Sequence, residues 1–339
     1  MKKKEINIKE LSKITGFSVA TVSRALNGLV KGNMKKETYI KIIKTANNYQ
    51  YIPNRLSIGL RSGLTKIVGI IFPSNINPYY AMLVNLIEEK AFKNGYLTYV
   101  CNSNYDPIRE FNYIKMLKAQ MVSGILLCNT GISKSVLEEL DNRKSPIILL
   151  DEEVKNYHGF SIILDDFKGG YLGTVFLINN HCFDIAFITG PKKLNSTTER
   201  LKGAYFALKE NGLDIIKENI FYGDYSIEAG EKITAKIFLK KNVIKAIFCF
   251  NDLMAIGASN MLRKLNIKIP EEVSILGYDN IIFSKLISPS ISTVATSIES
   301  IAEATLNVIL NIRSGKRFLK KKFIIAPYLI ERESTLKRN

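Results

Sequence analysis

The segment that follows Ser18 combines helical spacing with side chains that suit contact with a nucleic acid. At about 100° per residue, one side of a helix here is apolar and holds Val22, Ala25 and Leu26. The other side carries small, hydroxyl-bearing and basic side chains, namely Val19, Ala20, Ser23 and Arg24. In a DNA major groove, small side chains can contact thymine methyl groups and arginine can grip guanine or a phosphate. Spacing alone fits an ordinary helical hairpin with a solvent-exposed face equally well.

Two further helices are expected to hold this face in position. Asn7 and Glu10 form a capping pair at the start of a first helix. Gly16 then allows a tight turn, and the Ser18 side chain can cap the second helix. A third helix, near residues 35–49, would close the core. We expect that core to contain Ile8, Leu11, Ile14, Tyr39, Ile42, Ile43 and Ala46.

The net charge of +17 is concentrated at the start of the chain. Residues 1–65 hold thirteen Lys and Arg side chains against three Glu, which is a net charge of +10. Such an excess in the first fifth of the sequence indicates a polyanionic partner for this segment.

From residue 66 onward, short apolar runs alternate with amphipathic helical stretches. This alternation predicts parallel sheets covered by helices on both faces, and the number of strands favours two α/β subdomains. We expect buried strands at 66–72, 96–102, 123–129, 146–151, 184–190, 246–252 and 273–279. Ligands of such sheets bind beyond the carboxyl ends of the strands. Those ends carry residues 75–80, 151, 190–200, 251–252 and 279.

Several other classes of protein find no support in the sequence. There is no P-loop, no dinucleotide-binding glycine pattern and no G-x-S-x-G motif, so we expect no cofactor and no enzyme activity. The four cysteines lie far apart and only two histidines are present, which disfavours a metal site. No apolar run approaches ~20 residues, and no apolar segment follows the basic start, so we expect a cytoplasmic protein.

Seven segments, taken together and in order, resemble the LacI/GalR family of transcriptional regulators over essentially the whole length of the chain. They are SVATVSRALNG, YIPNRLSIGLRSG, NPYYAML, GP with ERLKGA, NDLMAIGA, IPEEVSILGYDN and ERESTL. The resemblance implies a helix-turn-helix domain, a hinge helix, and a core of two doubly wound parallel-sheet subdomains like that of periplasmic binding proteins. The implied boundaries are 1–65 for the DNA-binding domain with its hinge at about 54–62, 66–164 with 297–327 for the N-subdomain, and 165–296 with 328–339 for the C-subdomain.

The resemblance also implies which residues contact DNA. Val19 and Ala20 match base-reading positions, and Leu60 matches a leucine that intercalates in the minor groove. The complete set is Ser18, Val19, Ala20, Thr21, Ser23, Arg24, Asn27, Asn54, Arg55 and Leu60. The sequence departs from the family pattern at Lys35, where a helix-capping serine is usual, and at Gly59, which weakens a hinge helix.

For the core, the resemblance implies an effector site between the subdomains. The matching positions are Tyr79, Tyr80, Asp151, Ser196, Arg200, Tyr225, Asn251 and Asp279. Aromatic rings with carboxylate, amide and guanidinium groups suit a sugar or sugar derivative. An ion pair at the strand ends and packing of the tyrosines between subdomains are the structural alternatives for these residues.

We therefore expect a transcriptional regulator, a repressor, that binds a near-palindromic operator in double-stranded DNA as a homodimer. A small-molecule effector would control it, and the protein would associate with the nucleoid and not with a membrane. Two alternatives stay open: a global carbon-catabolite-type regulator with a protein co-effector, and a cytoplasmic small-molecule-binding protein without a role on DNA.

Overall fold

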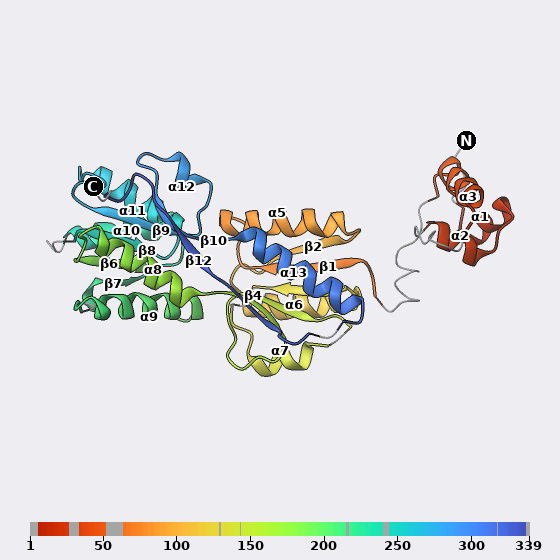
Figure 1. Ribbon diagram of the computed structural model, residues 1–339, viewed down its shortest axis with the longest axis horizontal. Helices are drawn as coiled ribbons and strands as arrows, with labels where there is room; N and C mark the ends of the chain where they lie inside the picture. Colours follow the sequence, from red (N-terminus) through yellow and green to blue (C-terminus); the bar gives the residue numbers. More distant parts are fainter. Residues whose placement is uncertain are drawn as a thin grey trace. The chain divides into compact units, whose positions relative to one another are not determined.

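The computed structural model describes residues 6–26, 34–51, 64–128, 130–142, 144–214, 217–239, 244–316 and 318–336. The chain divides into two compact units, Met1–Thr65 and Lys66–Asn339. Figure 1 labels the helices and strands of both units.

The described residues of the first unit form three helices: α1 (Ile8–Thr15), α2 (Val19–Leu26) and α3 (Lys36–Asn48). The predicted capping box is present, since Asn7 accepts from the backbone of Glu10 while the Glu10 carboxylate accepts from the backbone N–H of Asn7. Gly16 ends α1 with a φ of 77°, a left-handed conformation that glycine adopts without strain.

The core of this unit is smaller than predicted. Its buried residues are Leu11, Val22, Ala25, Ile42 and Ala46. The expectation for Ile14 was wrong, because this side chain is 44% exposed while Thr15 is buried. Lys35 occupies the N-cap of α3 and makes no capping hydrogen bond with its side chain. The departure from the family pattern thus leaves this helix without a side-chain cap.

The second unit contains two six-stranded sheets. The first has the order β11-β5-β4-β3-β1-β2, and all its neighbouring strands are parallel. Its strands are β1 (Ile67–Phe72), β2 (Leu97–Asn102), β3 (Gly124–Leu127), β4 (Ile147–Asp151), β5 (Phe160–Leu164) and β11 (Lys322–Ile325). The strand at β2 was expected to be buried; it lies at the edge of the sheet and is largely exposed.

Helices cover both faces of this sheet. On one face, α5 (Pro78–Lys93) and α13 (Ile298–Arg313) pack over alternate strand residues such as Ile70, Leu126 and Ile148. On the other face, α6 (Pro107–Ala119) and α7 (Lys134–Leu140) cover Ile71, Leu127 and their neighbours. The two-residue alternation of a strand thus gives each face its own apolar layer.

The second sheet has the order β12-β10-β9-β8-β6-β7. Its strands are β6 (Ile185–Thr189), β7 (Ile220–Tyr222), β8 (Ala246–Cys249), β9 (Ser274–Tyr278), β10 (Ser292–Thr296) and β12 (Pro327–Ile330). All pairings are parallel except that of β12 with β10, which is antiparallel. This exception arises because the chain passes from β11 directly into β12, without a crossover helix.

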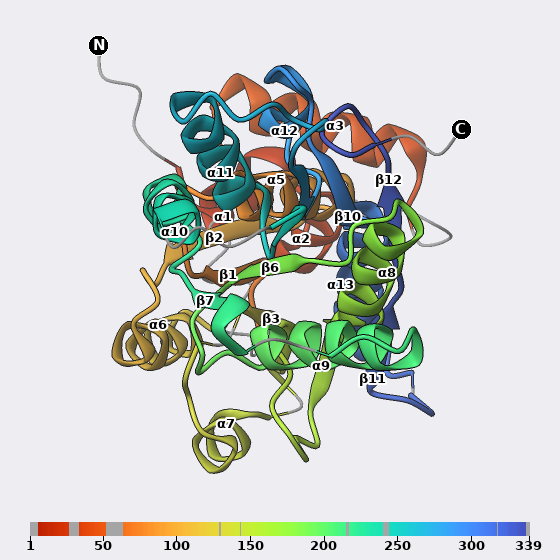
Figure 2. The same cartoon turned by 90° about the vertical axis from the view of Figure 1, so that its left-hand side faces the viewer.

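The helices of this second half form two pairs. Figures 1 and 2 show α8 (Asp166–Asn179) with α9 (Asn195–Glu210) on one face of the sheet, and α10 (Ile227–Leu239) with α11 (Asp252–Lys264) on the other. A short helix, α12 (Phe283–Leu286), and a 3-10 turn, η1 (Lys217–Asn219), complete the unit. The chain passes between the sheets three times: from β5 to α8, from β10 to α13 and from β11 to β12.

Candidate functional site

The second helix of the first unit, α2, has one buried and one open side. Val22 and Ala25 are buried, whereas Ser18, Ala20 and Arg24 are exposed. The partly exposed neighbours on the open side are Val19, Thr21 and Ser23. The Ser18 hydroxyl accepts from the backbone N–H of Thr21 at 3.2 Å, so this serine caps α2 as predicted. The other predicted DNA contacts, Asn27, Asn54, Arg55 and Leu60, lie outside the described residues.

A second candidate site is a narrow cavity of about 30 Å³ in the core unit, at the carboxyl ends of strands from both sheets. Its walls are formed by Asn77, Tyr79, Tyr80, Tyr105, Asp151, Glu152, Leu194, Ser196, Arg200, Tyr225 and Asp279. Seven of the eight predicted effector residues therefore lie around one space. A ligand larger than a water molecule therefore needs the walls of this cavity to move apart.

Local sequence signals place most of these side chains. Asn77 caps α5 by accepting from the backbone N–H of Tyr79 at 3.0 Å, which sets both tyrosines in the first helical turn. Asp151 ends β4, and Asp279 directly follows β9. The carboxyl ends of parallel strands thus deliver side chains from both halves of the core to the same cavity.

Four cavity residues have backbone conformations that L-amino acids seldom adopt. The φ angles are 57° at Tyr105, 70° at Asp151, 69° at Tyr225 and 101° at Asp279. Each such conformation costs about 1–3 kcal/mol, and residues of this kind cluster at functional sites. All four of these residues line one cavity. The fold therefore keeps them there in backbone conformations that are energetically unfavourable.

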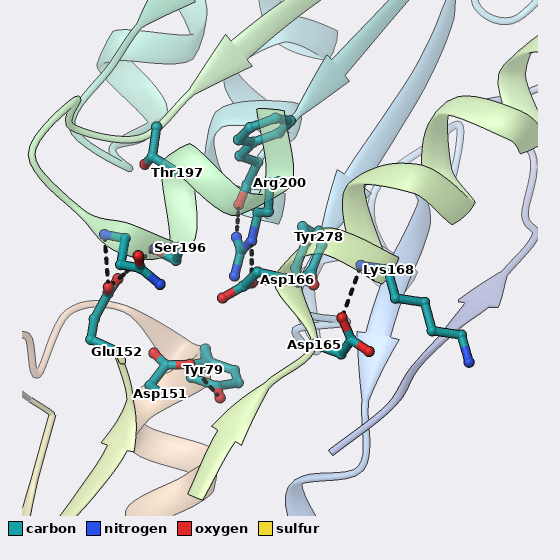
Figure 3. A network of polar contacts seen from close by, with 12 residues as sticks. Tyr79, Asp151, Glu152, Asp165, Asp166, Lys168, Ser196, Thr197, Arg200 and Tyr278 are labelled. Carbon is teal, nitrogen blue, oxygen red and sulfur yellow. Dashed lines mark hydrogen bonds and ion pairs between the residues drawn. The ribbon is translucent and has the colours of Figure 1, made fainter. Parts of the chain in front are cut away.

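Arg200 is almost completely buried and is held by three groups. Its Nε donates to Asp166 Oδ1 at 2.7 Å, and Nη1 donates to the carbonyl oxygen of Phe250 at 2.5 Å. The guanidinium carbon lies 3.6 Å from the centre of the Tyr278 ring. Figure 3 shows that the remaining nitrogen faces the space bounded by Asp151 and Ser196. Arg200 thus forms a buried ion pair, with Asp166, which was not among the predicted residues.

Glycines let the two helices that carry this pair approach each other. A methyl group on Gly170 of α8 would lie 1.9 Å from the backbone oxygen of Arg200, and one on Gly203 of α9 would meet Phe167 at the same distance. Larger residues would therefore separate the helices and pull Arg200 away from Asp166.

Glu152, which follows β4, links the first sheet to the start of α9. Its Oε2 accepts from the backbone N–H groups of Asn195 at 3.0 Å and Ser196 at 3.2 Å. Its Oε1 accepts from the Ser196 hydroxyl (Figure 3). A carboxylate at a helix N-terminus is favoured by the helix dipole, yet burial raises the pKa of Glu152 to about 7.

The two remaining carboxylates of the cavity differ in their partners. Asp151 accepts from the hydroxyls of Tyr80 at 3.1 Å and Tyr79 at 3.4 Å, and burial raises its pKa to about 6. Asp279 is 8% exposed, and its carboxylate has no hydrogen-bond partner among the described residues. Burial raises the pKa of Asp279 well above its usual value.

Asn251, the eighth predicted effector residue, lies outside this cavity. Its side chain accepts from the backbone N–H of Met254 at 2.9 Å and donates to the Tyr225 carbonyl at 3.0 Å, so it caps α11 and holds the Tyr225 loop.

Six residues of the site were not among those predicted: the cavity walls Asn77, Tyr105, Glu152 and Leu194, and the Arg200 partners Asp166 and Tyr278. Glu152 and Asp166 follow the ends of strands, the same signal that identified Asp151. Tyr105 lies in a loop with no such signal.

Together these observations define a class of protein: a helix-turn-helix unit joined to a two-sheet core of the periplasmic-binding-protein type, with a cavity between the sheets. Comparison with known proteins gives the family. Residues 65–320 match the model described as periplasmic binding proteins and sugar binding domain of the LacI family. The chain belongs to the LacI family of transcriptional regulators.

Transcriptional regulators of known name are similar to this chain over nearly its whole length. The chain is 32% identical to the HTH-type transcriptional regulator DegA of Bacillus subtilis, covering 97% of both proteins. It is 28% identical to the HTH-type transcriptional repressor PurR of Aliivibrio salmonicida, covering 97% of this chain and 99% of that protein. A Lac repressor dimer solved with operator and the anti-inducer ONPF has the same fold, with a TM-score of 0.86 at 23% identity over 98% of this chain and all of that one.

Proposed function

We propose that this protein is a repressor that binds a near-palindromic operator as a homodimer and releases or tightens its hold when a small molecule, a sugar or sugar derivative, occupies the core cavity. A DNA-binding regulator with this architecture needs no catalytic step, so we propose no enzyme activity. Operator binding would place it on the nucleoid.

The observation that carries the DNA-binding part is the division of α2 into a buried and an open side. Ala20 and Arg24 are exposed while Val22 and Ala25 fill the core, which is the arrangement a recognition helix needs to enter a major groove. The excess of Lys and Arg in residues 1–65 supplies the attraction to phosphate. We propose the same role for the remaining predicted contacts in residues 18–27 and 54–60.

Exposed apolar side chains support the homodimer. Leu97, Tyr99 and Val100 on the edge strand β2 are each more than 40% exposed. Ile282, Phe283 and Leu286, at and within α12, are at least 50% exposed. Apolar groups of this size gathered on edge elements are typical of surfaces that a partner covers. We propose that a second copy of the chain covers them.

The DNA-binding proposal is tested with an operator selected from random duplexes by the purified full-length protein. We expect the logarithm of affinity to fall steeply and linearly with the logarithm of salt concentration. Arg24→Ala should weaken binding about tenfold or more, since a good base contact contributes about 1–3 kcal/mol. Lys90→Ala in the core is the matched control and should change nothing. A salt-independent affinity would contradict the proposal.

The effector proposal is tested by thermal denaturation of the same protein with a panel of sugars and nucleobases. A ligand that binds the folded core raises its unfolding temperature by mass action. We expect stabilisation by at least one compound and none after Arg200→Ala. Equal stabilisation of both proteins would show that the binding site lies elsewhere.

A further inference from the structure

The core cavity is rich in carboxylates and poor in cations. Asp151, Glu152 and Asp279 line it, and Asp166 lies beside it in contact with Arg200. Against these four acids stands a single guanidinium among the described cavity residues. The acids also affect one another electrostatically. Asp151 and Asp166, for example, both raise the pKa of Asp279.

The four acids differ in the groups that compensate their charges. Asp166 is paired with Arg200 at 2.7 Å. Glu152 is held by the N-terminus of α9. Asp151 receives only neutral tyrosine hydroxyls, and the carboxylate of Asp279 receives no hydrogen bond among the described residues. Two buried carboxylates therefore face the cavity with no cation in hydrogen-bond contact among the described residues. Arg200 lowers the pKa of both, but its ion pair is with Asp166.

A ligand that excludes water from this cavity must deal with those two charges. A neutral ligand could offer these carboxylates hydroxyl hydrogen bonds but no compensating charge, so burying them under it is less favourable unless they take up protons. A cationic ligand would neutralise them. The described part of the chain contains no group of three or more His, Cys, Asp or Glu side chains arranged to hold a metal ion, so an organic cation fits better than an inorganic one.

The other cavity walls suit such a cation. Four tyrosines line the space: Tyr79, Tyr80, Tyr105 and Tyr225. The Tyr79 and Tyr80 rings meet edge to face, with centroids 5.2 Å apart. Tyrosine faces attract ammonium groups, by about 0.5–2 kcal/mol each as the site becomes drier. The Arg200 nitrogen that has no partner among the described residues can donate to hydroxyl groups on the rest of the ligand. The Ser196 hydroxyl, which donates to Glu152, can still accept from them.

We propose that the effector of this protein carries a positively charged amine that is bound by Asp151 and Asp279, on a hydroxylated scaffold, as in an amino sugar. This inference rests on the proposed function, in which the cavity binds a small effector. It narrows the ligand from sugars in general to sugars that bear a cationic amine.

The test compares ligands that differ only in charge. The full-length protein is titrated calorimetrically at pH 7 with glucosamine, galactosamine and mannosamine, with their N-acetyl derivatives, and with the parent hexoses. At this pH Asp151, whose pKa burial raises to about 6, is largely ionised. For at least one of the three sugars, we expect the amino sugar to bind at least tenfold more tightly than both its N-acetyl derivative and its parent hexose.

Variants assign the preference to the cavity acids. Asp279→Asn should remove the preference for the amine while leaving the protein folded, since asparagine tolerates a positive φ and the carboxylate has no described partner to lose. Asp151→Asn should weaken the preference in the same way. Asp184→Asn, an equivalent change at an exposed position, should leave it intact.

Each outcome decides the inference. If neutral sugars bind as tightly as the amines, the proposed preference for an amine is wrong but the effector site remains. A preference for the amine that persists in both Asp279→Asn and Asp151→Asn would also contradict the proposal and leave the effector site in place. Binding of none of the amines would also overturn it. The operator titration described above is independent of these results, so the proposed role on DNA stands or falls separately.

Discussion

Arg200 shows how a single side chain can serve both the fold and the site. Two of its nitrogens and the face of its guanidinium are used within the protein, by Asp166, the Phe250 carbonyl and Tyr278. Burial disfavours the charged form, yet the combined effect of Asp166, Tyr278, Tyr225 and Asp279 outweighs burial and raises the pKa of Arg200. The residue therefore stays charged and presents one fixed nitrogen to the cavity.

The pairing of Arg200 with Asp166 can be measured with a double-mutant cycle. Arg200→Met leaves a buried carboxylate without its partner and should lower the free energy of unfolding by about 3–5 kcal/mol. Adding Asp166→Asn should restore part of that loss, since the orphaned charge is then removed. Urea unfolding of each variant gives the values.

The exposed pair of Lys202 with Glu199 provides the control for this cycle. These side chains are 54% and 27% exposed, so removing their charges should cost less than about 1 kcal/mol. A cost for Arg200→Met no larger than this would show that the buried pair does not stabilise the core.

At the scale of elements, the junction of β4 with α9 joins the two halves of the core. Glu152 follows a strand of the first sheet and accepts hydrogen bonds from the first turn of a helix on the second. The same helix carries Arg200 one turn further along. Any movement of one half against the other must therefore act on the cavity and on this contact together.

Removing the Glu152 carboxylate should loosen this junction. Glu152→Ala deprives the N-terminus of α9 of its acceptor, a loss of about 1–2 kcal/mol. We expect amide hydrogen exchange at Asn195 and Ser196 to become about 5–30 times faster. Glu153→Ala, which removes only an exposed pair with Lys322, is the control. Unchanged exchange at both amides would mean that the junction is held by other contacts.

At the scale of the whole molecule, the buried acids make core stability depend on pH. Burial raises the pKa of Asp151 to about 6 and those of Glu152 and Asp252 to about 7, from ordinary values of 3.8 and 4.5. Between about pH 4 and pH 7 the folded protein therefore binds more protons than the unfolded chain. The stability these groups contribute is present at low pH and is lost as pH rises through their folded pKa values.

We accordingly expect the free energy of unfolding to fall by about 6 kcal/mol between pH 5 and pH 7.5, of which about 1.4 kcal/mol comes from Asp151. Asp151→Asn should remove that share of the dependence, because asparagine does not titrate. Asp224→Asn, at an exposed position, should not change it. Urea unfolding at the two pH values measures the effect. A stability that rises over this range would contradict the assignment of these acids as buried and undercompensated.

Local patterns in the sequence were sufficient to predict most of the helices, turns and strands. The Asn7 and Glu10 capping pair, the turn at Gly16 and the division of α2 into two sides follow from neighbours within one or two helical turns. The alternation of apolar runs with helices predicted two α/β subdomains, and strand ends predicted most of the cavity. Each of these features depends on residues that are close in the chain.

The partners of the cavity side chains were decided only by the tertiary structure. Arg200 pairs with Asp166, 34 residues away, because glycines let α8 and α9 approach. Glu152 binds the start of α9, 43 and 44 residues away. Spacing along the chain does not report distances between packed elements. The sequence by itself therefore determined most of the residues that reach the cavity, and packing decided which charges are satisfied within the protein and which are left for a ligand.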